Sequence, residues 1–273
     1  MPMELHFLGT GGGRFVTLTQ RRWTGGIRFI TGDNLHLHLD PGPGALIYSI
    51  RTRLSAQRVG AILISHCHLD HYADAEVMIE AMTRGMTKKR GILVGSRSVL
   101  RGTENCGPVV SRYHREMPKE VIEVAPGHRF RLGDLNVLTT ETKHSDPDAV
   151  GFLFETPDVG DVGYTSDTVH FKGIGKYFRR VRLLILCVLR PHGKPWKGHM
   201  TTDDAIRIIK ESKPDGAIIT HFGMSMLNAK PEREASLIER DTGVPTVDAK
   251  DRMRVTLGED VEIYQAGKKI TLV

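Results

Sequence analysis

The chain has few cysteines and no apolar run long enough to cross a membrane. Its three cysteines, Cys67, Cys106 and Cys187, are odd in number and far apart, which argues against a disulfide framework and favours a reducing compartment. The longest apolar run, VRLLILCVL at 181–189, is much shorter than the roughly 20 residues of a membrane span, so it predicts a buried strand. The first ten residues lack a basic segment followed by a long apolar one, so we expect no signal peptide, no membrane partner and a cytoplasmic location.

The sequence also lacks a linker and a block of like charge. No stretch rich in Ser, Pro and Gly divides its 273 residues, so we expect one domain that spans residues 1–273. The hydrophobic fraction of 40% and the charged fraction of 26% are those of a globular protein. The formal net charge of +6 suits an anionic substrate, but it suits a merely basic surface equally well.

Short apolar runs that end at Gly, Asp or His predict many strands. They are rich in Val, Ile, Leu and Thr and cover residues 4–9, 26–31, 35–40, 59–65, 91–95, 135–141, 150–156, 162–166, 182–188 and 216–221. The tail, residues 252–273, predicts two or three more strands. Helical patterns cover 73–84, opening at Asp74, and 201–212, opening at Thr201 or Thr202. The combination predicts an α/β fold with mixed sheets.

The stretch SHCHLDHYAD at 65–74 concentrates histidines between a predicted buried strand and a predicted helix. A loop at the carboxyl end of a strand is where α/β proteins place their sites. His66 and His68 are two residues apart in extended backbone and therefore point the same way. Asp70 and His71 follow as the chain turns. Imidazole nitrogens and carboxylate oxygens are good ligands for Zn²⁺ and related ions, so the loop predicts a metal site.

One loop cannot supply every ligand of a two-metal site, and three further residues stand at the ends of apolar strands. We assign His66, His68 and His144 to one ion and Asp70, His71 and His221 to the other, with Asp167 as a bridge. The donors suit Zn²⁺ or Mn²⁺, and Fe²⁺ as well. Two ions ~3.5–4 Å apart hold a hydroxide between them and clamp the oxygens of a displacement, which predicts a hydrolase.

Other residues in similar patterns have simpler explanations. GTGGG at 9–13 is not a dinucleotide loop, because Arg14 stands where the last Gly of that motif belongs and no convincing helix follows. His36 and His38 share one strand face, and we expect sheet histidines whose hydrogen bonds are satisfied. Asp40 is expected to order the ligand loop from behind, as carboxylates near metal sites often do.

SHCHLDH resembles the His-x-His-x-Asp-His motif of the metallo-β-lactamase superfamily. FLGTGGG at 7–13, LDPG at 39–42 and ITHF at 219–222 stand in that superfamily's order, so the resemblance covers nearly the whole chain. It implies a metallo-β-lactamase-like αββα sandwich, with two mixed β-sheets flanked by helices and a dinuclear site at one edge. Asp167 stands where secreted β-lactamases usually carry a Cys, which argues against antibiotic hydrolysis.

Residues 198–223, GHMTTDDAIRIIKESKPDGAIITHFG, resemble the branch that contains ribonuclease Z and the cyclic-phosphate phosphodiesterase of phosphonate breakdown. The resemblance implies that His199 lies near the metals and binds the phosphoryl oxygen or protonates the leaving alkoxide. Asp70, besides binding metal, would orient the hydroxide. Ribonuclease Z carries HEAT where this chain reads LCVLRP at 186–191, and no long tRNA-clamping arm is visible. A small or cyclic phosphodiester is therefore favoured over tRNA.

Basic side chains near His199 are candidate contacts for an anionic substrate. They are Arg190, His192, Lys194 and Lys197, with Arg22 from the RRWTGG stretch at 21–26. Three alternatives stay open: a ribonuclease Z-like RNA endonuclease, a glyoxalase II-type thioesterase, and a noncatalytic metal-stabilised RNA-binding module. RNA is the less favoured substrate. A homodimer is compatible with the branch.

Overall fold

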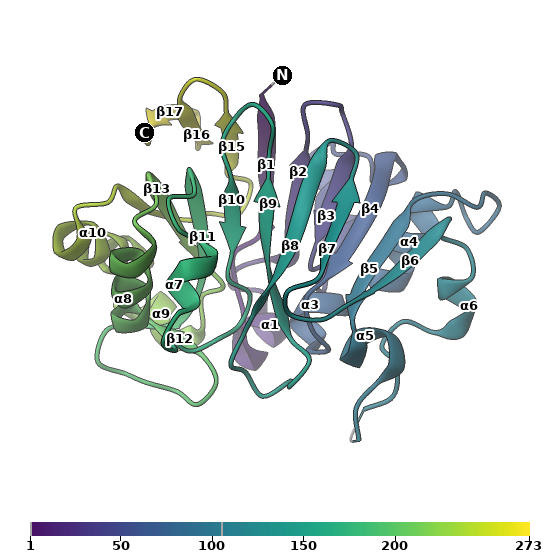
Figure 1. Ribbon diagram of the computed structural model, residues 1–273, viewed down its shortest axis with the longest axis horizontal. Coiled ribbons are helices and arrows are strands. Elements are labelled where there is room, and N and C mark those ends of the chain that lie inside the picture. The colour runs from purple at the N-terminus through teal and green to yellow at the C-terminus, as the bar shows by residue number, and fades with distance from the viewer. Residues whose placement is uncertain (1, 105) are drawn as a thin grey trace.

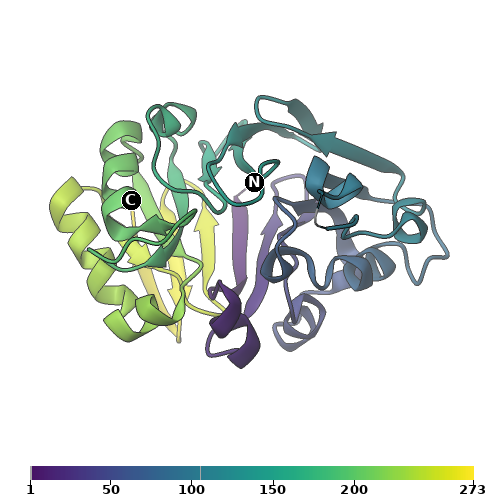
Figure 2. The same ribbon diagram turned by 90° about the horizontal axis from the view of Figure 1, so that it is seen from below.

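The computed structural model describes residues 2–104 and 106–273. Two β-sheets pack face to face, with helices against their outer faces (Figure 1). Seen from below, the helices of the C-terminal third and the blue helices of the first half of the chain lie on opposite sides of the molecule, and the purple N-terminal helix lies between them (Figure 2). The predicted α/β class with two mixed sheets flanked by helices is confirmed.

The first sheet has nine strands in the order β17-β16-β15-β1-β2-β3-β4-β5-β6. They are β1 (Met3–Gly9), β2 (Thr24–Ile30), β3 (His36–Leu39), β4 (Val59–Ile64), β5 (Ile92–Ser96), β6 (Glu120–Val124), β15 (Arg254–Leu257), β16 (Val261–Gln265) and β17 (Lys268–Thr271). Strands β3 to β6 run parallel, and the other neighbours pair antiparallel.

The second sheet has eight strands, seven of them in the order β14-β13-β11-β10-β9-β8-β7, and β12 pairs with β11. They are β7 (Arg129–Leu132), β8 (Leu135–Glu141), β9 (Val150–Glu155), β10 (Val162–Tyr164), β11 (Leu183–Arg190), β12 (Met200–Thr201), β13 (Gly216–Thr220) and β14 (Thr246–Asp248). Strands β10, β11, β13 and β14 run parallel.

The helices are short. Near the first sheet lie α1 (Arg14–Thr19), α2 (Ala45–Arg51), the 3-10 helix η1 (Ala56–Arg58), α3 (Leu69–Tyr72), α4 (Ala75–Met82), α5 (Arg97–Arg101) and α6 (Arg112–Arg115). Near the second lie α7 (Ile174–Tyr177), α8 (Thr202–Ser212), α9 (Met224–Ala229) and α10 (Pro231–Thr242). Helix α8 opens with Thr201 as N-cap, and a capping box joins Thr201 to Asp204, so the start signal seen in the sequence is confirmed.

Apolar side chains from both sheets fill the space between them. Phe7 and Phe29 of the first sheet and Phe152 and Phe154 of the second are completely buried, and the rings of Phe29 and Phe154 lie 4.9 Å apart. Burying one such side chain stabilises the fold by roughly 1.5–3 kcal/mol. This shared core fixes the two sheets relative to each other.

The chain turns that carry the predicted ligands, the glycine loop and Asp40 all lie at one edge of the sandwich, the lower edge in Figure 1. The ligands follow β4 of the first sheet and β8, β10 and β13 of the second, and the glycine loop and Asp40 follow β1 and β3. These strands share a direction within each sheet, which follows from the pairings. Residues distant in sequence therefore meet there. Within the described ranges, no helix has both the length and the apolarity to cross a membrane.

One prediction about the glycine loop was wrong. Helix α1 follows GTGGG directly, although no helix was expected there. Gly13 is its N-cap, no side chain caps it, and it is only six residues long, so the sequence offers no start signal. Strands β6 and β7 were also not predicted, because exposed Glu and Arg residues interrupt their short apolar patterns.

Candidate metal centre

The ligand loop after β4 is held from behind by the buried carboxylate of Asp40, which follows β3. This carboxylate accepts from the Ser65 amide at 2.7 Å and the Ser65 hydroxyl at 2.8 Å. It also accepts from Nδ1 of His71 at 2.9 Å and from the Tyr164 hydroxyl, in the opposite sheet, at 2.8 Å. Asp40 thus connects the ligand loop of the first sheet to Tyr164 of the second.

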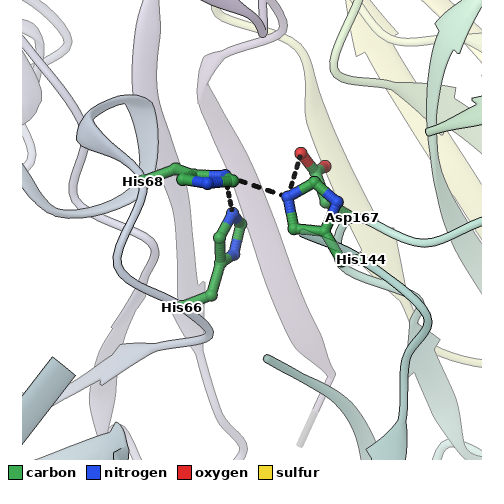
Figure 3. A group of neighbouring side chains, drawn as sticks. All are labelled: His66, His68, His144 and Asp167. Atoms are coloured by element: carbon green, nitrogen blue, oxygen red, sulfur yellow. Dashed lines mark hydrogen bonds and ion pairs between the residues drawn. The ribbon is translucent and has the colours of Figure 1, made fainter. Parts of the chain in front are cut away.

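One group of predicted ligands contains His66, His68, His144 and Asp167 (Figure 3). Nδ1 of His68 lies 3.1 Å from Nε2 of His66 and 2.9 Å from Nε2 of His144. An oxygen of Asp167 lies 3.9 Å from Nε2 of His144. Two of these residues come from the first sheet and two from the second.

The second group contains Asp70, His71 and His221. Nε2 of His221 lies 3.1 Å from Nε2 of His71 and 3.3 Å from a carboxylate oxygen of Asp70. Asp167 is close to this group as well, with Oδ2 3.7 Å from Nε2 of His71 and Oδ1 3.3 Å from Nδ1 of His221. Asp167 therefore lies between the two groups.

The hydrogen bonds of three histidines fix where their free lone pairs point. Nδ1 of His144 lies 2.6 Å from the carbonyl oxygen of Gly198, and Nδ1 of His71 faces the Asp40 carboxylate, so both nitrogens are donors. Nδ1 of His66 lies 2.9 Å from the Ser65 hydroxyl, which itself donates to Asp40. In each neutral ring, Nε2 is left as the acceptor that faces the cluster. Partners of this kind orient metal-binding histidines.

The spacing of the donor atoms fits metal ions. Tetrahedral Zn²⁺ with bonds of 2.0–2.1 Å sets two ligand atoms roughly 3.3 Å apart, close to the separations within each group. Two buried atoms, Oδ1 of Asp167 and Nδ1 of His221, make no hydrogen bond in the described part of the chain, although they lie 3.3 Å apart. A buried acceptor without a donor is costly unless a cation lies nearby.

Burial and charge shift the pKa values of these groups in opposite directions. Burial lowers the pKa of His66 and of His144, which favours the neutral, metal-binding form. Burial alone would lower the pKa of His71, but the carboxylates around it, led by Asp40, raise it well above the usual value. Burial would raise the pKa of Asp167, but nearby histidines, led by His221, lower it strongly.

Glycines bring the backbone close to the cluster. The amide of Gly13 donates to Oδ2 of Asp70 at 2.8 Å. A Cβ at Gly12 would lie 2.3 Å from ring atoms of His221, and one at Gly42 would lie 2.0 Å from the carbonyl oxygen of Asp70. The sequence identified this glycine loop only through the family resemblance. Its three consecutive glycines, which follow the strand after Thr10, were the signal of a close backbone approach.

His199 lies at the mouth of the cluster. Its Nδ1 is 3.4 Å from Oδ2 of Asp167, and its ring packs edge to face on His144 at 4.8 Å between centroids. The side chain keeps 17% of its surface exposed, so it faces both the ligand groups and solvent. This is a suitable position for contact with a substrate.

The basic residues of the 190–199 loop are engaged in several ways. Arg190 donates to the carbonyl of Lys194 at 3.1 Å and lies over the ring of Trp196 at 5.4 Å. His192 pairs with Asp203 at 2.7 Å. Lys194 and Lys197 are exposed. Among the described residues, no hydrogen bond or ion pair joins these side chains to the ligand groups.

Two further residues lie beside parts of the cluster, Arg22 beside the glycine loop and Trp196 beside His199. Arg22 lies over the ring of Phe222 at 6.0 Å and approaches the Thr10 hydroxyl at 3.4 Å, beside the glycine loop. Trp196 was missed: it is 60% exposed and forms a β-bridge with His199. An exposed Trp near a candidate catalytic His was the available signal.

A second missed residue is Asp146, two positions after His144. Its carboxylate accepts from the amide of Cys67 at 2.9 Å and from the Ser98 hydroxyl at 2.6 Å. The carboxylate thereby connects the loop after β8 to the ligand loop after β4. Burial raises the pKa of the Cys67 thiol to about 12, so this cysteine stays protonated.

The two histidines of β3, His36 and His38, differ in whether their ring nitrogens have hydrogen-bond partners. His38 is satisfied, because its ring nitrogens contact Arg28 at 2.9 Å and the carbonyl of Gly25 at 2.7 Å. The same prediction was wrong for His36, whose ring nitrogens are buried without a partner in the described part of the chain. Its strand neighbours are Ile30 and Val59, which offer no polar side chain. Burial lowers the pKa of His36 to about 4.

Comparisons with known proteins extend across the chain. The family model described as "Beta-lactamase superfamily domain" matches residues 36–222. An uncharacterized protein of Methanocaldococcus jannaschii is 42% identical over 97% of this chain and 99% of its own length. The ribonuclease Z of Methanopyrus kandleri is 29% identical over 66% of this chain and 56% of its own length.

A solved structure gives the same picture of the fold. A diphosphatase from the PhnP family superimposes with a TM-score of 0.68 at 17% identity, covering 94% of this chain and 98% of that one. At that identity the likeness concerns the fold alone. The implied metallo-β-lactamase-like sandwich is confirmed, and the sequence match to a ribonuclease Z supports the resemblance to that branch.

Proposed function

The chain belongs to the β-lactamase superfamily, and on that basis we propose that it is a dinuclear metal-dependent phosphodiesterase acting on a small or cyclic phosphodiester. The observation that carries the proposal is the position of His199, 3.4 Å from the carboxylate that lies between the two ligand groups. Any hydrolase of this superfamily needs the metal ligands, so the ligands alone do not indicate the substrate. A proton donor beside them suits an alkoxide leaving group.

The residues divide into two sets of ligands and one shared carboxylate. His66, His68 and His144 would hold one ion, Asp70, His71 and His221 would hold the other, and Asp167 would contact both. Such a pair, when bound, supplies a nucleophilic water of lowered pKa and polarises a phosphoryl oxygen. Zn²⁺, Mn²⁺ and Fe²⁺ all accept this donor set.

The chain itself positions the groups and moves the protons. The Gly13 amide fixes one oxygen of Asp70, so that this carboxylate is held in place to orient the attacking water. As the new P–O bond forms and the ester P–O bond breaks, His199 donates a proton to the departing oxygen. Arg190, Lys194, Lys197, His192 and Arg22 are proposed to attract the anionic substrate, in keeping with the net charge of +6.

Two related proteins support phosphate chemistry. The Methanopyrus kandleri relative is a ribonuclease Z, and a structural neighbour is a diphosphatase. Exposed Trp196 beside His199 adds a surface on which an aromatic group, such as a nucleobase, can stack. An RNA substrate is the second candidate for this reason.

The test is hydrolysis of bis(p-nitrophenyl) phosphate by chelator-stripped protein and by protein refilled with Mn²⁺ or Zn²⁺. We expect turnover only after refilling, with two ions bound per chain. Two bound ions without turnover, together with hydrolysis of S-acylglutathione, would favour the thioesterase alternative. Tight, salt-sensitive RNA binding without any turnover would favour the binding module. Failure to bind any ion would overturn the proposal.

A further inference from the structure

A basic cavity lies away from the metal centre, on the outer face of the first sheet. It has a volume of about 590 Å³ and lies between the end of α2 and the β16–β17 hairpin. None of the seven proposed ligands lines it. The side chains that line it include five cations and, among the described residues, no carboxylate: Arg51, Arg252, Arg254, Lys268 and Lys269.

Most of this charge has no partner. Arg254 pairs with Glu4 at 3.1 Å, and Lys269 pairs with Glu262. For Arg51, Arg252 and Lys268, no carboxylate lies within ion-pairing distance in the described ranges. Like charges that converge on a cavity raise its positive potential and attract anions.

Aromatic rings, rather than carboxylates, support two of these arginines. Arg252 lies over the ring of Trp23 at 4.9 Å, and Arg51 lies over the ring of Tyr48 at 6.0 Å. Trp23 and Tyr48 stack on each other, with centroids 4.0 Å apart and planes 3° from parallel. The two guanidinium groups are thus placed by one stacked pair, and their N–H donors stay free for a ligand.

A buried cation lies behind the cavity wall. Arg28 is completely buried and pairs across the sheet with His6, which lines the cavity. Its guanidinium contacts His38 and the Ser49 hydroxyl, which are uncharged partners when the imidazole is neutral. Its charge adds to the potential of the cavity.

We propose that this cavity binds a ligand that presents several phosphate groups. The volume lies in the range of small-molecule sites, and guanidinium and ammonium groups are the preferred partners of phosphate oxygens. The phosphates of a free nucleotide and those of an RNA strand share this chemistry. The proposal stands independently of the reaction at the metal centre.

The test is calorimetric titration of the metal-loaded full chain with inositol hexasulfate at low salt. This probe is a compact polyanion, contains no phosphoester to hydrolyse and competes weakly for metal ions. We compare Arg252→Gln and Lys268→Gln with Lys210→Gln, a matched control in which an exposed lysine of α8 outside the cavity is changed. A lost charge-assisted contact corresponds to roughly tenfold or more in affinity, so we expect that loss in the two cavity variants only.

In the titrations, three outcomes would overturn the proposal: no binding by the unchanged protein, undiminished binding by both cavity variants, or an equal loss in Lys210→Gln. Displacement of the probe by ATP or by a short single-stranded RNA supports the site and identifies the source of the phosphates. Displacement by neither would overturn the assignment to phosphate ligands. Thermal unfolding of each variant verifies the fold, and hydrolysis of bis(p-nitrophenyl) phosphate should be unchanged in Lys268→Gln.

Discussion

Replacing Asp40 by Asn tests how the metal centre is held, because it keeps the shape of the side chain and removes its charge. Oδ1 accepts from the Ser65 amide, and Oδ2 accepts from Ser65, His71 and Tyr164. If the Asn oxygen takes the place of Oδ2, its NH₂ group faces the Ser65 amide, and a donor then meets a donor. That clash costs roughly 1–3 kcal/mol, and the three remaining bonds each weaken by about 1 kcal/mol when their acceptor becomes neutral. We therefore expect a loss of about 4–6 kcal/mol in unfolding free energy.

The same change should weaken metal binding by about 10- to 100-fold, the usual effect of removing a partner that orients a ligand. A second readout separates this role from simple destabilisation. In the metal-free chain the carboxylates around His71, led by Asp40, hold its pKa well above the usual value, which favours the protonated ring, and metal binding requires that the proton be released. Calorimetry in buffers of different ionisation enthalpy counts the released protons, and Asp40→Asn should release fewer.

Tyr164→Phe is the matched control, because it removes one bond to Asp40 and leaves His71 untouched. We expect it to lose about 1.5–3 kcal/mol of stability and to keep metal affinity within about twofold of the unchanged protein. If Asp40→Asn binds metal as tightly as the unchanged protein and releases as many protons, Asp40 does not position His71.

The remaining predictions concern single residues. His199→Ala should keep its metals but lose about 10²–10⁴-fold in kcat on a cyclic phosphodiester with an alkoxide leaving group. The loss should be much smaller on bis(p-nitrophenyl) phosphate, because its leaving group needs no proton. Equal losses on both substrates would contradict the role of His199 as proton donor. Gly12→Ala should weaken metal binding, measured by chelator competition, because its Cβ would lie 2.3 Å from the His221 ring. Gly107→Ala is the control, because a Cβ there meets nothing within 4 Å, and it should leave metal binding unchanged. Burial lowers the pKa of His36 to about 4 in the folded chain, below the value near 6.5 in the unfolded chain. The neutral ring therefore contributes fully to stability above pH 6.5, and this contribution is lost as the pH falls towards 4. In urea unfolding, His36→Phe should lose less stability than the unchanged protein over this pH range, by at most roughly 3 kcal/mol. An unchanged pH slope would refute that account.

The grouping of the seven proposed ligands could be predicted from the sequence because their pattern is local and chemically unusual. Four of them fall within residues 66–71, where the loop after β4 runs into α3, and the others each follow an apolar strand, so the direction of the strands brings them to one edge. The residues behind them were harder to find. Asp146 and the Gly12 contact depend on which loops face each other across the two sheets, and no local pattern of residues encodes that arrangement.

The misjudged elements have physical reasons of the same kind. Helix α1 lacks a capping side chain, and its presence depends on Gly13, whose amide contacts Asp70 from another part of the chain. His36 was expected to find a hydrogen-bond partner, as most buried polar groups do. Its strand neighbours are aliphatic, and the pairing of strands, which sets those neighbours, is not visible in the sequence of β3 alone.

Each group of proposed ligands takes residues from both sheets: His66 and His68 face His144 and Asp167, and Asp70 and His71 face His221. An ion in either group would therefore act as a cross-link between the two halves of the sandwich. An ion that binds only the folded chain stabilises it by mass action. Loss of the ions would therefore remove two cross-links between the sheets as well as the catalytic activity. We expect stripping to speed thermal unfolding of the whole sandwich, with the edge that carries the ligand loops exchanging its amide hydrogens first. The site would then be part of what joins the two sheets as well as the place where they meet.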